Sequence, residues 1–582
     1  MASSRAVDAA PLLLAAALVA LPLLSNDFVA YQIALFLVYG IATQGVALCW
    51  GRLGFLPLGH ALFFGLGAYL AGGMLKAAQD HAAWFLALPL ALLLPAALAY
   101  AVARLVFARS LRSGPYFSLI TLATTMLGFL AAQQWSAVTG GFNGMANVPD
   151  LPGTERFGSL YWLIAAVAVA STAGLGLLLR RPLGVLWSAV AQNEDRLQLF
   201  GYATDRIKAG AYALSALLAA LAGALFAVHQ GIVTPQAVGF VLSTEFVIWA
   251  AVGGKASPLG ALLGAVLVGY ASAELRERFA SWEVLVGLLF MAVVRFLPDG
   301  VAGLGAPWLE RKRQQAPEPL PTRDADATAA ARPALSLAFD GVETGQGGVK
   351  ILDGLSLHVE GPGIRCIIGP NGAGKTSAFN VMTGRLPLRA GRIVLDGDDI
   401  GGHAAWRVAR RGVGRKLQIP SVFTGLTVQQ NLSVALWGRG LGGTAWVSLA
   451  PQGRRSALQD ELLARFPALR EQLHIPAGRL SQGHRQALEF IMTVSPEPRL
   501  LLLDEPCAGL SPAETHHMID VIRTAVQRIG AAGLLIEHDI SAVAAMGGEV
   551  FVLHQGRLLA QGSLADVQAD PAVRAVYAGG HK

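Results

Sequence analysis

A glycine-rich segment in the second half of the chain has the residue types of a phosphate-binding loop. It follows the strand-like run 364–368 and reads Gly369-Pro370-Asn371-Gly372-Ala373-Gly374-Lys375-Thr376. Glycines let backbone N–H groups surround phosphate oxygens at the start of a helix. The Lys375 ammonium would neutralise the β- and γ-phosphates, and the Thr376 hydroxyl would bind Mg²⁺. The spacing therefore predicts a site for ATP and Mg²⁺, which we extend by one residue to Ser377.

Two adjacent carboxylates follow a second apolar run in the same half. Leu500–Leu503 has the character of a buried strand, and Asp504 and Glu505 come directly after it. At a strand end beside the phosphate-binding loop, Asp504 would hold Mg²⁺ directly or through water. Glu505 would orient or deprotonate the water that attacks the γ-phosphate. An acidic strand end with a purely structural role is the weaker interpretation beside the Lys375 loop.

The elements that must position these groups differ between the two halves of the chain. Hydrophobic residues make up 54% of the sequence and charged residues only 14%, which is unlike an ordinary soluble domain. The apolar runs stop near Trp308, and most have about the length that crosses a bilayer. They are residues 11–24, 28–50, 53–75, 83–107, 116–135, 160–179, 209–233, 240–253, 259–273 and 284–301. We predict an all-α, multi-pass membrane domain of roughly eight to ten helices.

The distribution of positive charges is the one expected for a membrane protein and does not indicate nucleic-acid binding. The net charge is +7, and arginines gather in short loops between apolar runs. If the second half is cytoplasmic, the count of spans places the basic loop 180–208 inside and the charge-poor loop 137–158 outside. This distribution is the one that the positive-inside rule requires.

The basic loop 180–208 differs from the other loops because it combines a helical apolar pattern with polar residues. Val185, Ala189 and Leu197 supply the apolar pattern, and Gln192 to Asp195 are polar. Such a segment either docks on a partner surface or is a solvated amphipathic connector. The presence of an ATP-binding half favours docking.

His60 and Glu245 are among the ionisable residues that stand inside apolar runs of the first half. Placing an ionisable group at membrane depth is costly, so each is expected to face the helix bundle, a solute pathway or a partner. Helix packing is the ordinary explanation for both. We carry them forward as the candidate solute contacts.

A segment without apolar anchors separates the two halves. From Glu310 to Pro333 it contains a basic cluster, several prolines and a run of Ala, Asp and Thr, which is typical of a flexible tether. The predicted domains are a transmembrane domain at 1–308, a linker at 309–333 and a nucleotide-binding domain at 334–582.

Four further motifs accompany the phosphate-binding loop in a fixed order: Gln418, Leu480-Ser481-Gln482-Gly483-His484, Ala508-Gly509-Leu510 and His538. With them, the second half resembles ABC ATPases, an α/β fold with a helical subdomain. The resemblance implies that Gln418 senses the γ-phosphate and the metal and faces the membrane domain. It also implies that Ser481 and Gly483 cap the ATP held by a partner ATPase, and that His538 is the switch histidine of the catalytic site.

Two positions depart from this pattern. Gln346 precedes Gly347 and Gly348 where the family usually has an aromatic residue that stacks on adenine, and His484 replaces the usual Gln or Glu. An alternative therefore stays open, in which the chain is a weakly hydrolysing, structural or regulatory half paired with an active ATPase.

The first half resembles permeases of branched-chain amino acid importers, especially their urea and short-chain amide branch. The resemblance rests on Leu58-Gly59-His60-Ala61, Gly114-Pro115-Tyr116-Phe117, Thr139-Gly140-Gly141-Phe142-Asn143-Gly144 and Ala251-Val252-Gly253-Gly254. It implies an importer in a bacterial inner membrane with two permeases, two ATPases and a periplasmic solute-binding protein. The partners would be related subunits or a second copy of this chain. The implied solute is urea, a short amide or a hydrophobic amino acid.

Overall fold

The computed structural model describes residues 2–77, 84–109, 114–279, 281–304, 334–440 and 456–578. The chain forms two compact units. The first comprises the described residues of Met1–Ala191 and Thr204–Pro317, and the second those of Gln192–Ala203 and Glu318–Lys582. The predicted linker at 309–333 lies outside the described residues. A short segment of the first half of the sequence thus folds with the second unit.

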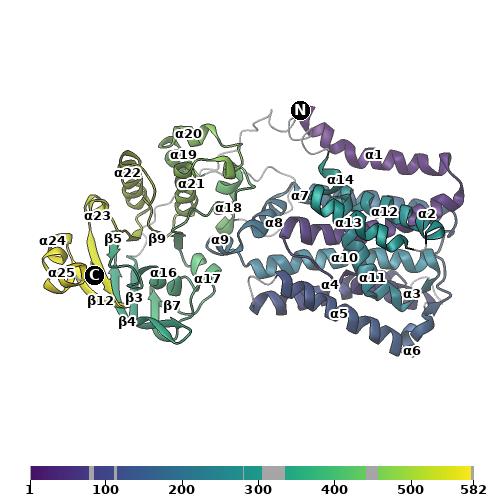
Figure 1. Cartoon of the computed structure of the whole chain (residues 1–582), viewed down its shortest axis with the longest axis horizontal. Coiled ribbons are helices and arrows are strands. Elements are labelled where there is room, and N and C mark those ends of the chain that lie inside the picture. Colours follow the sequence, from purple (N-terminus) through teal and green to yellow (C-terminus); the bar gives the residue numbers. More distant parts are fainter. Residues whose placement is uncertain are drawn as a thin grey trace. The chain divides into compact units, whose positions relative to one another are not determined.

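The first unit is a bundle of apolar helices (Figure 1). Its long helices are α1 (Ala2–Leu24), α2 (Asp27–Ala47), α3 (His60–Ala77), α4 (Trp84–Arg109), α5 (Gly114–Gln134), α7 (Ser159–Leu179), α10 (Thr204–Gln230), α11 (Phe240–Gly253), α12 (Pro258–Arg278) and α13 (Trp282–Phe296). Seven helical segments of the described part are long and apolar enough to cross a membrane, and Pro11–Leu24 and Phe240–Gly253 are shorter apolar helices. The predicted all-α apolar half is confirmed, apart from a two-stranded pairing of β1 (Met145–Ala146) with β2 (Ile232–Val233).

Helix α10 packs closely against α3 because small residues line the contact. A Cβ atom added at Gly223 would collide with the Phe64 carbonyl, and one added at Gly67 would collide with Ala220. Where lipid removes the hydrophobic drive for helix association, such close backbone approach supplies dispersion contacts instead. The backbones of the two helices therefore lie in close contact along this face.

The second unit contains two sheets. The six-stranded sheet has the order β12-β11-β5-β10-β9-β8, and the four-stranded sheet has the order β4-β3-β6-β7. The strands of the first are β5 (Gly363–Ile368), β8 (Val413–Lys416), β9 (Leu500–Asp504), β10 (Ala532–Ile536), β11 (Glu549–His554) and β12 (Arg557–Gly562). Those of the second are β3 (Ser336–Gln346), β4 (Val349–Glu360), β6 (Ala390–Leu395) and β7 (Asp398–Asp399).

In the six-stranded sheet β5, β8, β9, β10 and β11 are parallel, and β12 pairs antiparallel with β11. Leu500–Leu503 of β9 is fully buried, as expected for a central strand covered on both faces. Because parallel strands end at one edge, the loops after β5, β9 and β10 gather there. That edge carries the predicted ATP site.

Helices complete the second unit. Its helices include α9 (Glu194–Gln198), α16 (Lys375–Met382), α17 (Ala405–Arg410), α18 (Val428–Gly440), α19 (Ala457–Ala464), α20 (Pro467–Glu471), α21 (Gln482–Val494), α22 (Pro512–Ile529), α23 (Ile540–Met546), α24 (Leu564–Ala569) and α25 (Pro571–Ala578). Helices α18 to α21 cluster beside the sheet (Figure 1). They form the predicted helical subdomain, so the α/β domain with a helical part is confirmed.

Candidate nucleotide-binding and docking site

The phosphate loop, residues Gly369–Thr376, connects β5 to α16. Gly369, Gly372 and Gly374 have φ values of 150°, 81° and 98°, a region that a side chain would strain. Gly374 precedes α16, which begins at Lys375. The Lys375 Nζ donates to the carbonyl oxygens of Gly369 at 2.7 Å and Pro370 at 2.9 Å. The lysine thus lies across its own loop, and burial lowers the pKa of its ammonium.

The two predicted metal-binding side chains lie together. The Thr376 hydroxyl donates to Oδ1 of Asp504 at 3.4 Å, and Asp504 is only 1% exposed. Burial raises the pKa of Asp504, against the opposing influence of Arg415. A hydroxyl and a buried carboxylate form a donor set that suits Mg²⁺, which prefers oxygen ligands. The cation would also stabilise the ionised carboxylate that burial disfavours.

Glu505 and His538 form a second pair at the same edge of the sheet. The Nε2 atom of His538 lies 2.9 Å from Oε1 of Glu505. Glu505 has a φ of 44°, in a region rarely occupied by residues with a side chain, and its N–H donates to the Ile536 carbonyl at 2.9 Å. The strained turn after β9 is therefore held by β10, the strand that His538 follows. This arrangement can position a water molecule for attack on a phosphate.

The signature residues Ser481 and Gly483 lie at the start of α21. Ser481 caps this helix and its hydroxyl accepts from the His484 N–H at 3.3 Å. The N-terminus of a helix attracts anions. Gln486 of the same helix donates to the Ala508 carbonyl at 2.6 Å, which connects α21 to the loop after Glu505.

Gln418 lies in the loop directly after β8 and is exposed. It is therefore accessible to a nucleotide or to another chain. The backbone of Gln346 pairs with Val349 at the end of β3, whereas its side chain is outside the described part of the structure.

The two candidate solute contacts lie in the first unit, His60 on α3 and Glu245 on α11. His60 is fully buried, with Nε2 3.2 Å from both the carbonyl and the hydroxyl of Ser215 in α10. Its ring lies edge-on to Phe246, with centroids 6.5 Å apart. Glu245 precedes Phe246 and interacts electrostatically with Tyr39. Tyr39 in turn lies among the rings of Phe64, Phe226, Phe246 and Trp249.

The docking segment, Gln192–Ala203, makes polar contacts with the nucleotide-binding part of the second unit. Gln192 accepts from the Gly425 N–H at 2.7 Å, and Asn193 donates to the Ser421 hydroxyl at 2.8 Å. Further contacts join Asp195 to Arg385, Gly201 to Arg410 and Tyr202 to Val434. These contacts favour the docked interpretation of this segment over a solvated connector.

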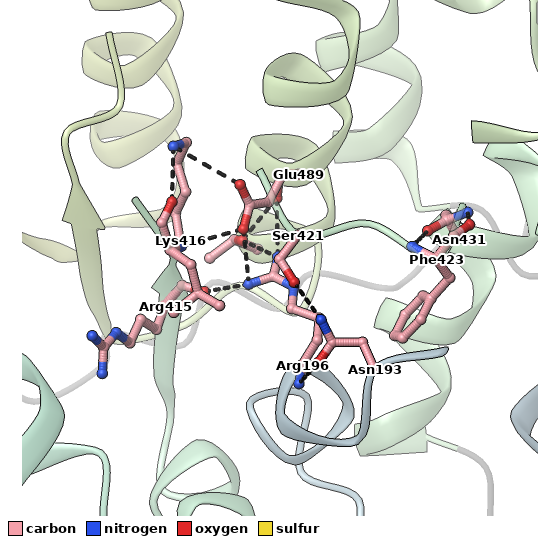
Figure 2. A network of polar contacts seen from close by, with 10 residues as sticks. Asn193, Arg196, Arg415, Lys416, Ser421, Phe423, Asn431 and Glu489 are labelled. Atoms are coloured by element: carbon pink, nitrogen blue, oxygen red, sulfur yellow. Dashed lines mark hydrogen bonds and ion pairs between the residues drawn. The ribbon is translucent and has the colours of Figure 1, made fainter. Parts of the chain in front are cut away.

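Sequence reasoning missed three residues of this docking site: Arg196, Arg415 and Glu489 (Figure 2). All three are at most 2% exposed. From the sequence alone, Arg196 is one of several basic residues in the loop 180–208. The available signal was Glu489, which stands within the apolar run Ala487–Met492, because an ionised residue in such a run is seldom buried without a partner.

Comparisons with known proteins agree with this architecture. Residues 28–294 match the family described as branched-chain amino acid transport system / permease component, and residues 352–508 match the ABC transporter family. A high-affinity branched-chain amino acid transport ATP-binding protein of Pseudomonas aeruginosa is 35% identical over 42% of this chain and 97% of the relative. A protein of the same description from Salmonella typhimurium is 33% identical over 42% and 97%.

A crystal structure of a nucleotide-free ATP-binding cassette from an ABC transporter aligns with 24% identity and a TM-score of 0.36, over 42% of this chain and 98% of that chain. The two ATP-binding relatives align along 97% of their own length at 35% and 33% identity, which shows that the chain is homologous to them. The chain therefore belongs to the ABC transporter family, as an ATP-hydrolysing member in which a permease component and an ATP-binding domain are fused.

Proposed function

We propose that this chain imports a small polar solute across a bacterial inner membrane as the permease and ATPase half of an ABC importer. The observation that carries the proposal is the docking segment, because residues 192–203 interrupt the permease sequence and pack on the nucleotide-binding part. The chain runs directly from this segment into α10, the helix at the centre of the first unit. A displacement of the docked segment would therefore act on the membrane helices.

The ATPase step follows from the positions of the chain's own groups. The phosphate loop and Lys375 would bind the phosphates, while Thr376 and Asp504, with Gln418, would hold Mg²⁺. When bound, the metal would neutralise charge on the transferred phosphoryl group. Glu505 orients the attacking water and accepts its proton, and His538 holds the Glu505 carboxylate in place. Ser481 and Gly483 would complete the ATP site of a second ATPase, which is either another copy of this chain or a related subunit.

Two solute classes fit the proposal. The family description of residues 28–294 and the names of the relatives support a branched-chain or other hydrophobic amino acid. The motifs quoted above support urea or a short amide. His60 and Glu245 are the proposed solute contacts, beside the rings around Tyr39. A periplasmic binding protein would deliver the solute and share in its selection.

The solute class is tested through the binding protein and through transport. The partner binding protein is identified by co-purification with the membrane-embedded complex, and its affinities for leucine, urea and acetamide are measured by calorimetry. Vesicles containing the complex should then accumulate the preferred labelled solute only with internal ATP and external binding protein. Accumulation of none of the three solutes would contradict the proposed substrate classes.

A weakly hydrolysing, regulatory half is the second candidate, and Gln346 together with His484 is the observation behind it. The Glu505–His538 pair supports an active ATPase instead. The two candidates differ in their response to Glu505→Gln. An active half loses most transport turnover in this variant, whereas a regulatory half keeps it.

A further inference from the structure

Arg196 is the most completely buried charge of the docking segment. Its side chain is 0% exposed, although it belongs to a helix of only five residues, α9. The guanidinium donates from Nη1 to the Arg415 carbonyl at 2.6 Å and from Nη2 to the Thr493 hydroxyl at 2.9 Å. Its Nη1 lies 3.4 Å from Oε1 of Glu489. One side chain thus contacts both β8 and α21.

The Glu489 carboxylate contacts both the docking segment and the end of β8, the strand that leads to Gln418. Its Oε1 atom accepts from the Leu417 N–H at 3.2 Å, and its Oε2 atom lies 3.8 Å from Nζ of Lys416. Arg196, Lys416 and Glu489 are all fully buried, and Figure 2 shows the ion pairs that join them. One carboxylate therefore faces two cations, and its position fixes the backbone directly before Gln418.

Arg415 extends the network to the phosphate loop. While its carbonyl accepts from Arg196, its own guanidinium donates to the Phe379 carbonyl at 3.1 Å and to the Asn380 side chain at 2.8 Å. Both residues belong to α16, the helix that begins at Lys375. The same guanidinium also bonds to Thr383, just past the end of that helix. Arg196 is therefore connected on one side to the helix that starts at the phosphate loop, and on the other to the helix that starts at Ser481.

Burying charged side chains costs free energy unless ion pairs and hydrogen bonds of good geometry compensate for the lost hydration. Replacement of a buried ion pair by apolar residues is often neutral or stabilising, so such a pair is weak support for stability alone. Arginine suits the position because its planar fork donates in several fixed directions, which a lysine ammonium at the end of a flexible stem does not reproduce.

We propose that Arg196 is the positioning residue through which ATP binding acts on the membrane helices, with Glu489 as its partner on α21. The inference rests on the proposed transport function. A movement of α16 or α21 on ATP binding would shift Arg415 or Glu489, and the buried guanidinium would carry the docking segment with it. The segment continues into α10 at Thr204, so the shift reaches the first unit through the chain itself.

The test measures the response of the first unit to MgATP in the full-length complex, embedded in nanodiscs. Hydrogen exchange is followed in the first turns of α10 and, separately, in the phosphate loop. The variants are Arg196→Lys, Arg196→Met, Glu489→Gln and the double variant Arg196→Met/Glu489→Gln. Arg528→Met is the matched control, because it removes an ion pair with Glu461 that is exposed and joins α22 to α19, not the docking segment to α21.

In the wild type and the control, MgATP should slow exchange in both regions. In Arg196→Lys and Arg196→Met, the phosphate loop should keep its MgATP protection, while the change in α10 should fall about tenfold. The double variant should be no worse than Arg196→Met, because the two side chains act as one unit.

A full-sized α10 response in Arg196→Lys and Arg196→Met would overturn the proposal. Proportional loss of protection in both regions would also overturn it, since that result indicates a merely structural residue. Additive effects of the two substitutions would refute the pairing with Glu489. Uptake assays on the wild type test a different proposal. Failure to transport leucine, urea and acetamide would contradict the proposed solutes, whereas the hydrogen-exchange response to MgATP would still decide the role of Arg196.

Discussion

The Nε2 atom of His538 lies 2.9 Å from the Oε1 atom of Glu505, although the two residues follow different strands of the sheet. Glu505 follows β9 and His538 follows β10, and these strands are parallel neighbours. The pairing of the strands therefore brings the carboxylate and the imidazole to one edge, beside Asp504 and Thr376.

This pair gives the first prediction. Glu505→Gln keeps the shape of the side chain and removes the base, so ATP hydrolysis by the purified complex should fall by about 10²–10⁴-fold. Binding of MgATP should remain, because the phosphate loop is unchanged. Phosphate release and nucleotide binding are measured on the same preparation. A variant that hydrolyses ATP at half the wild-type rate would exclude Glu505 as the base.

Asp504 gives a prediction about the balance of stability and function. Burial raises the pKa of this carboxyl above its unfolded value, so its contribution to stability is lost as the pH rises through the folded pKa. At neutral pH the ionised group should therefore destabilise the nucleotide-free chain. Asp504→Asn should raise the melting temperature without nucleotide, and should abolish Mg²⁺-dependent ATPase activity.

The control for Asp504→Asn is the response to MgATP. The wild type should gain stability on adding MgATP, since ligand binding to the folded state shifts the equilibrium, whereas the variant should gain little. Thermal denaturation with and without MgATP measures both effects. A variant that melts lower than the wild type without nucleotide would contradict the stability argument.

Gln346 gives a prediction about nucleotide affinity. An aromatic ring at this position is expected to stack on the base, and such stacking contributes about 1–3 kcal/mol. Gln346→Trp should therefore tighten ATP binding on the order of tenfold, and Gln346→Ala should change it little. Equilibrium binding of a fluorescent ATP analogue and of ATP itself checks the change. Equal affinity of the Trp and Ala variants would show that this position does not contact the base.

The contact between α10 and α3 gives a matched pair of substitutions on one helix. Gly223→Ala adds a methyl group that collides with the Phe64 carbonyl, whereas the space around Gly210 is open. Overpacking of this kind costs about 1–3 kcal/mol, so Gly223→Ala should lower the melting temperature and yield of the purified complex. Gly210→Ala should leave both unchanged. Equal effects of the two substitutions would contradict the close packing of these helices.

Local chemistry made much of this protein predictable from its sequence. The phosphate loop is contiguous, so Gly369 to Thr376 needs only a strand before it and a helix after it, and β5 and α16 supply both. The hydrophobic runs of the first half correspond to ten helices, because a bilayer segment must satisfy its backbone hydrogen bonds within itself. Asp504 was recognisable as a strand-end carboxylate for the same local reason.

Only the tertiary structure decided which residues from distant parts of the chain meet. Arg196 and Glu489 are 293 positions apart. The residues around each of them in the sequence do not indicate that the two side chains meet. The placement of Gln192–Ala203 in the second unit likewise depends on many long-range contacts. A buried charge is favourable only where the fold provides a partner in the correct geometry, and that geometry is a property of the whole folded unit.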